Sequence, residues 1–201
     1  NISNSEQLRE TIHHYFHSTF NRYEQLFETL ACDEAYYKKP IPLRHPLIFY
    51  LGHTATFFIN KLILAGLISE RINPAFESMF AVGVDEMSWD DLSDSHYQWP
   101  TVQAVKDYRQ QVRVVVDKIM SETPLTSAIN WDHPWWPIVM GIEHERIHLE
   151  TSSVLIRQHA LHFVQPHPEW PICQQDGDAP INDLVNIPAA QITLKKEKEK
   201  P

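Results

Sequence analysis

Two histidines four residues apart, His144 and His148, are the strongest chemical signal in the sequence. At about 100° per residue, this spacing puts both imidazoles on one side of a helix, about 40° apart and one turn along it. Two neutral imidazoles placed in this way can bind one metal ion at about 2.0–2.1 Å. The nearby charged residues Glu143, Arg146 and Glu150 fall on a different face. The pair is therefore predicted to point inward at a metal site; the alternative is an exposed or hydrogen-bonded pair without metal.

A third ligand is offered by His53, in the middle of the apolar stretch LGHTATFFINKL. A lone histidine on an apolar helix face is more often a core residue with a hydrogen bond than a ligand. Here a second helix independently presents an inward pair, and helical bundles build metal sites from facing helices in this way. We therefore predict that His53, His144 and His148 bind a metal together. Asn60 lies on the same stripe as His53 and is a candidate to support the site.

The segment from His144 to His148 also matches the pattern H-E-x-x-H of zinc peptidases, in which the glutamate is the general base. The arginine at position 146 puts a charge in a helix that such enzymes bury. The longer form of the motif fails, because Glu150 and Thr151 stand where its glycine is needed. No edge strand that could hold a peptide substrate is evident. These observations disfavour a peptidase.

Four long segments with apolar residues every three or four positions would carry these ligands, and each predicts a helix. They cover residues 3–30, 46–68, 101–124 and 134–158. We expect an all-α four-helix bundle over residues 1–165, with a long crossover between the second and third helices, residues 69–100. The crossover contains an acidic stretch, residues 85–91. Residues 166–201 are a Pro-rich linker, a possible short strand at 185–194 and a Lys- and Glu-rich end.

Composition narrows the functional classes. The chain of 201 residues has a formal net charge of −9, so neither nucleic acid nor an anionic membrane is an expected partner. Only five glycines are present, and Gly-rich phosphate loops are absent. No apolar run reaches the roughly 18–20 residues of a membrane span. Two distant cysteines indicate a reducing, cytoplasmic location. Six other histidines are expected to be solvated: His13, His14, His17, His159, His162 and His167.

Three stretches resemble a known family: RHPLIFYLGHTATFFINKL (44–62), FAVGVDEMSWDDL (80–92) and MGIEHERIHLETSSVLIRQ (140–158). One histidine on the second helix and H-x3-H on the fourth are similar to the DinB-like metal-binding bundles. More closely, residues 1–195 resemble the N-terminal domain of the 5-histidylcysteine sulfoxide synthases. These are iron enzymes of ovothiol biosynthesis and relatives of the ergothioneine sulfoxide synthases.

The resemblance implies a non-haem Fe(II) bound by His53, His144 and His148, with zinc or nickel as a substitute in a crystal. The family pattern H-x3-H-x-E ends here at Glu150, which lies off the ligand stripe, so we assign it a supporting role without an iron bond. The family reaction couples the sulfur of cysteine to the imidazole ring of histidine with O2 and yields a sulfoxide. The substrates implied are cysteine, histidine and O2.

The family also has a second domain, similar to the formylglycine-generating enzyme, which completes the substrate pocket. Residues 185–194, VNIPAAQITL, resemble the start of that domain. The bundle is therefore expected to contact a C-terminal catalytic domain in a longer protein, and this chain alone is expected to be inactive. Two alternatives stay open: a stand-alone DinB-like metal-dependent thiol transferase, and a metal-free structural bundle.

Overall fold

The computed structural model describes residues 2–81, 97–126, 128–171 and 177–191. The chain divides into two units, residues 1–171 and 172–201. The described part of the second unit, residues 177–191, has neither helix nor strand and is exposed throughout. The prediction of a short strand at 185–194 is therefore wrong for residues 185–191. Residues 192–194 lie outside the described part of the chain. The assignment of this tail to a second domain stays a prediction.

Four long helices form the first unit, as predicted: α1 (Ile2–Phe27), α3 (Leu47–Leu64), α5 (Val102–Glu122) and α6 (Trp136–Ile156). Pro46 precedes α3, and the side chain of Thr101 caps α5 by accepting a hydrogen bond from the backbone N–H of Ala104 at 3.2 Å. Two short helices were not predicted: α2 (Asp33–Tyr37) and α4 (Pro74–Met79). Helix α4 begins at Pro74, directly after Asn73, whose side chain caps the helix by accepting a hydrogen bond from the backbone N–H of Phe76.

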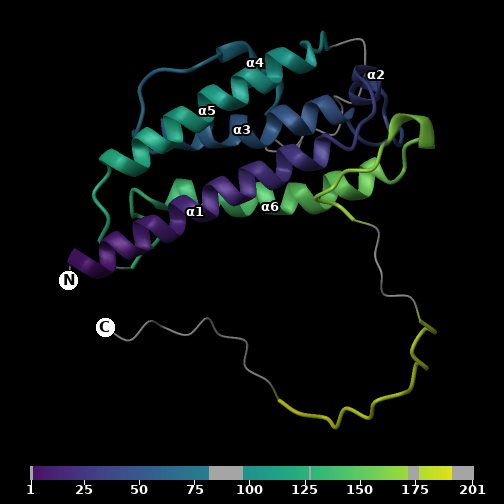
Figure 1. Cartoon of the computed structure of the whole chain (residues 1–201). Coiled ribbons are helices and arrows are strands. Elements are labelled where there is room, and N and C mark those ends of the chain that lie inside the picture. Colours follow the sequence, from purple (N-terminus) through teal and green to yellow (C-terminus); the bar gives the residue numbers. More distant parts are fainter. Residues whose placement is uncertain (1, 82–96, 127, 172–176, 192–201) are drawn as a thin grey trace. The chain divides into compact units, whose positions relative to one another are not determined.

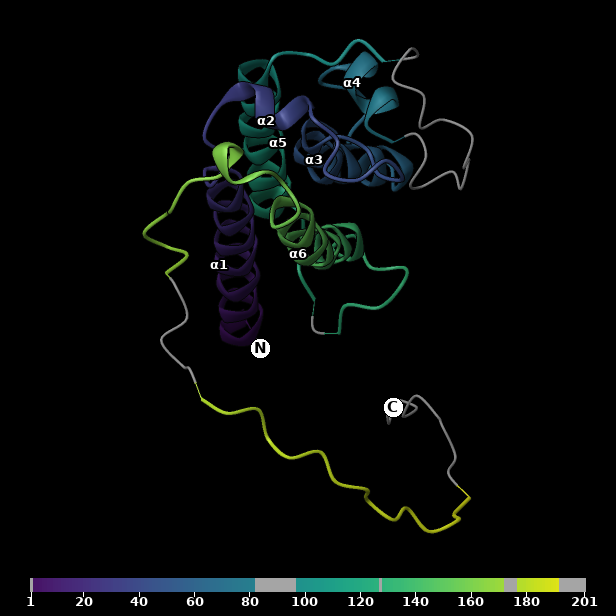
Figure 2. The ribbon, with the colours of Figure 1, turned by 90° about the vertical axis from the view of Figure 1, so that its right-hand side faces the viewer.

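The long helices are not arranged as a simple up-and-down meander. α1 packs against α6 and α5, and α3 packs against α6 and α5, so α1 and α3 lie diagonally across the bundle (Figures 1 and 2). α3 and α5 run in the same direction, because Arg109 near the start of α5 donates to the carbonyl of Leu51 near the start of α3. The chain therefore needs a long crossover to return from the end of α3 to the start of α5. The segment between α3 and α5 provides it, and α4 within that segment packs back on α3. The acidic stretch 85–91 lies outside the described residues.

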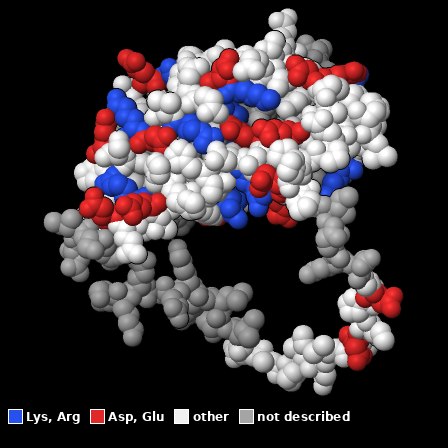
Figure 3. Space-filling view, viewed as in Figure 1, with Lys and Arg blue, Asp and Glu red and all other residues white. Residues whose placement is uncertain are grey.

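The central element is α3, which is buried on most of its faces. Among the described helices it alone is long and apolar enough to cross a membrane, yet 78% of that window is buried inside the bundle. A core helix satisfies the same criteria, so this is weak support for a membrane span. On the face of the bundle drawn in Figure 3, acidic and basic side chains alternate without forming a patch of one sign.

Two glycines allow close packing around α3. A Cβ at Gly141 in α6 would overlap the ring of Phe58, which is fully buried. A Cβ at Gly52 would lie only 2.6 Å from the ring of Phe80, at the end of α4. These contacts bring α6 and α4 close to the segment of α3 that carries His53. The glycines thus help to set the separation of the helices that provide the predicted ligands.

Candidate metal centre

The three predicted ligands meet at one point between α3 and α6. Ligand nitrogens of His53, His144 and His148 all lie within 4.8 Å of one another. The Nε2 atoms of His53 and His144 are 3.3 Å apart. Ring centroids of the three imidazoles lie 4.5–4.9 Å apart. Side chains 91 residues apart in sequence are thus placed for a common ligand, because the middle of α3 faces the middle of α6.

Backbone and aromatic contacts orient His53. Its Nδ1 lies 2.6 Å from the carbonyl oxygen of Phe80 and therefore donates to it. That tautomer makes Nε2, the nitrogen facing His144, the acceptor nitrogen of the ring and its potential metal ligand. The ring of Phe49 stacks on His53 at 5.2 Å between centroids. A hydrogen bond from the second nitrogen to a backbone carbonyl is the usual way in which proteins orient a metal-binding histidine.

The other two histidines are held in their neutral form. Burial, and then the neighbouring His53 ring, lower the pKa of His144 to about 2 and that of His148 to about 3. Phe57 stacks on His144 at 3.7 Å between centroids, and Tyr50 lies beside His148. Neutral imidazole is the form that binds transition metals. Near neutral pH, these two rings can therefore bind a metal ion without first releasing a proton.

The residues present fit a transition-metal ion. The donor set consists of three neutral imidazoles, which suit iron, zinc, nickel or copper rather than magnesium or calcium. The Nδ1 atoms of His144 and His148 are buried and have no hydrogen-bond partner among the described residues. Buried polar atoms of this kind are uncommon, and an ion bound at Nε2 of His144, the nitrogen that faces His53, would not satisfy Nδ1 of the same ring. No described carboxylate joins the three ligand nitrogens in this group.

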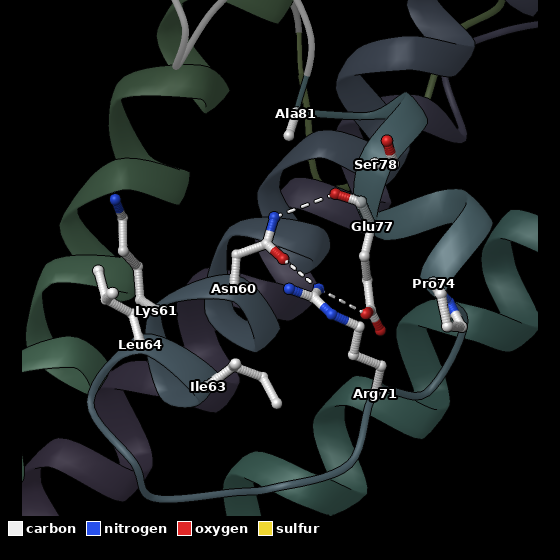
Figure 4. A pocket seen from close by; sticks show the side chains of 9 residues that line it. All are labelled: Asn60, Lys61, Ile63, Leu64, Arg71, Pro74, Glu77, Ser78 and Ala81. Atoms are coloured by element: carbon white, nitrogen blue, oxygen red, sulfur yellow. Dashed lines mark hydrogen bonds and ion pairs between the residues drawn. The ribbon is translucent and has the colours of Figure 1, made fainter.

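The two predicted supporting residues lie on different sides of this site. Glu150 is exposed and, with His148, Arg44 and Tyr50, lines a cavity of about 350 Å³. Asn60 is half-buried and lines a separate cavity of about 570 Å³ (Figure 4). No hydrogen bond between either residue and the triad is present within the described part of the chain. Their supporting roles stay predictions.

Asn60 contributes instead to the contact between α3 and α4. Its amide donates to the backbone oxygen of Glu77 at 3.1 Å and accepts from Arg71 at 2.7 Å (Figure 4). Arg71 also pairs with the buried carboxylate of Glu77 at 2.9 Å. The amide therefore helps to attach the crossover to α3.

The glutamate of the H-E-x-x-H pattern is engaged elsewhere. Glu145 is fully buried, and its Oε1 accepts from Arg109 of α5 at 2.7 Å and from Thr54 of α3 at 3.1 Å. A carboxylate held by a buried guanidinium in the bundle core is not available as a general base for a water on the metal. The geometry therefore agrees with the sequence argument against a peptidase.

Arg109 links the two helices that carry the triad, and it was not among the site residues predicted from the sequence. It donates to Thr54 at 2.8 Å and to the carbonyl of Leu51 at 3.0 Å, in addition to Glu145. Thr54 and Glu145 each follow a predicted ligand directly in sequence. A signal was present, because Arg109 stands between Val105 and Val112 on the apolar stripe of its helix. A charge on such a stripe indicates a buried partner.

The fold and the inward-facing triad are those of a helical bundle with a candidate metal site. The family model of the DinB superfamily matches residues 15–152, and the chain belongs to this superfamily. The chain is also similar to Ergothioneine biosynthesis protein 1 of Neurospora crassa, with 26% identity over 167 residues. The match covers 78% of this chain but only 19% of that relative, so the chain spans about a fifth of the relative's length.

Proposed function

We propose that this chain is the iron-binding domain of a non-haem Fe(II) sulfoxide synthase of ovothiol biosynthesis, located in the cytoplasm. The reaction joins the thiol of cysteine to a ring carbon of histidine with O2. One oxygen atom ends in the sulfoxide and the other in water, so O2 accepts the four electrons released by C–S bond formation and sulfur oxidation. The observation that carries the proposal is the convergence of buried His53 and His148 with partly buried His144 in an aromatic setting.

Iron bound by three neutral imidazoles would supply O2 activation and a binding site for the thiolate, because the protein ligands leave coordination positions open. The chain's own residues fix the three nitrogens. The carbonyl of Phe80 sets the tautomer of His53, and Phe57 limits rotation of the His144 ring. The cavity beside His148, of about 350 Å³, supports access for a small polar ligand, with Arg44 and Glu150 offering charges of both signs.

A complete active site needs a second wall. His148 and Glu150 line a cavity that is open to solvent on one side. Coupling two substrates requires both to be held in near-attack geometry, which contributes up to about 7–11 kcal/mol. We assign the missing contacts to the C-terminal domain that the resemblance implies. Similarity to a relative about five times longer than the matched region supports a longer protein with a further domain.

The test compares two proteins loaded anaerobically with Fe(II) and then given cysteine, histidine and O2. The 201-residue chain should form no detectable 5-histidylcysteine sulfoxide by mass spectrometry. A protein in which the family's C-terminal domain follows residue 201 should form it, and its His144→Ala variant should not. Product from the short chain would contradict the proposed division of labour. Consumption of a thiol without O2 would instead favour a thiol transferase.

A further inference from the structure

A second group of metal-ligand side chains lies between α1 and α5, away from the triad. The Nε2 atoms of His13 and His17 are 3.2 Å apart. Oδ1 of Asp117 lies 2.8 Å from Nε2 of His17 and 3.4 Å from Nε2 of His13. Both histidines were predicted from the sequence to be solvated. The structure instead brings them together with a carboxylate 100 residues away in the sequence.

We propose that His13, His17 and Asp117 form a second binding site, for a divalent transition-metal ion such as Zn²⁺. Ligands of a tetrahedral zinc ion with bonds of about 2.0–2.1 Å lie about 3.3 Å from one another. The three separations in the structure, 3.2, 2.8 and 3.4 Å, lie within about 0.5 Å of this value. Two imidazoles and one carboxylate are also ligands that Zn²⁺ accepts in proteins.

The site is accessible from solvent. The side chains of His13, His17 and Asp117 are 51%, 26% and 36% exposed. An ion can therefore reach them, and a water molecule can occupy the fourth coordination position. The i,i+4 spacing of His13 and His17 on α1 is the same as that of His144 and His148 on α6. The bundle thus presents two histidine pairs of equal spacing, one in the core and one at the surface.

One neighbour weakens the second site. NH1 of Arg113 lies 3.2 Å from Nδ1 of His17 and donates to it. When a metal occupies Nε2, Nδ1 carries the proton, and this contact must be given up. Arg113 retains its bonds to Asn21 at 2.7 Å and Glu24 at 2.9 Å. Binding is therefore possible but should be weaker than at the triad, so it is best measured at equilibrium.

A metal bound here would connect α1 directly to α5. An ion that binds the folded chain and not the unfolded one raises the free energy of unfolding as its concentration rises. Zinc should therefore stabilise the bundle through this site in addition to any effect of the triad. This gives a second readout that does not depend on catalysis.

The experiment is equilibrium dialysis of the whole chain against micromolar Zn²⁺, followed by zinc analysis of the protein. His13→Ala should hold one zinc fewer than the wild type. His14→Ala is the matched control, because His14 is the exposed neighbour on α1, and it should hold as much zinc as the wild type. Equal zinc in His13→Ala and His14→Ala would overturn the proposal.

Two further variants separate this site from the triad. Asp117→Asn should lose the same equivalent as His13→Ala. His144→Ala should lose zinc from the triad but keep the equivalent that depends on His13. The rise in melting temperature produced by Zn²⁺ in the His144→Ala chain should disappear when His13→Ala is added. An undiminished rise in that double variant would show that the ion binds elsewhere.

Discussion

The buried Arg109–Glu145 pair permits a quantitative test of how the helices carrying the triad are held. Both side chains are fully buried, and their nearest N–O distance is 2.7 Å. Replacement of Glu145 by methionine keeps the approximate volume but removes the charge and both accepted hydrogen bonds. Breaking a buried pair from one side costs about 3–5 kcal/mol, because the other charge stays buried. Glu24, 3.1 Å from Arg109, remains as a counter-ion, so the expected loss lies near about 3 kcal/mol.

The assay is urea unfolding of the metal-free chain, followed by circular dichroism. The double variant Arg109→Met with Glu145→Met removes both charges, and it should be more stable than Glu145→Met alone. Glu150→Gln is the control, since this exposed glutamate on the same helix should change stability by no more than about 0.5 kcal/mol. A loss below about 1 kcal/mol in Glu145→Met, or a double variant less stable than the single one, would refute the reasoning.

Two other predictions concern packing and pH. Gly141→Ala should lower the free energy of unfolding by about 1–3 kcal/mol despite the higher helix propensity of alanine, because the new Cβ overlaps Phe58. Urea unfolding measures this loss, with Ala55→Gly as a comparison. An unchanged urea midpoint in Gly141→Ala would contradict the prediction. The metal-free chain should lose stability as pH falls below about 6.5, by up to about 1.4 kcal/mol per unit for each of His144 and His148. Stability falls with pH because burial lowers the pKa values of His144 and His148 in the native chain, to about 2 and about 3. Below about pH 6.5 the unfolded chain therefore binds protons at these two histidines that the native chain does not bind. Urea midpoints that stay level from pH 7 to about pH 4 would exclude this effect.

Much of the fold follows from short-range patterns. The four long helices could be predicted because their apolar residues repeat every three or four positions. The short helices α2 and α4 could not, since five or six residues carry too little periodicity. The diagonal placement of α1 and α3 depends on long-range packing, for which the long crossover was only an indirect sign.

Among the candidate metal ligands, too, some could be predicted from local sequence patterns and others could not. His144 and His148 could be recognised as a pair from their spacing, and His53 from its position in an apolar helix. His13 and His17 have the same spacing as the first pair, yet nothing nearby in the sequence marks Asp117 as their partner. Arg109 and Glu145 are charges that pair only when three helices assemble. Contacts between distant helices are determined by tertiary packing, which local patterns do not encode.

The central claim is tested most directly by iron analysis. The chain carrying His13→Ala, in which the surface site cannot contribute, is loaded anaerobically with Fe(II) and freed of unbound metal. It should retain one iron per chain, and His144→Ala added to it should abolish retention while helical circular dichroism stays nearly unchanged. The triad lies within 4.8 Å and has no described alternative ligand in that group. Iron retained unchanged after loss of His144 would contradict the proposed centre.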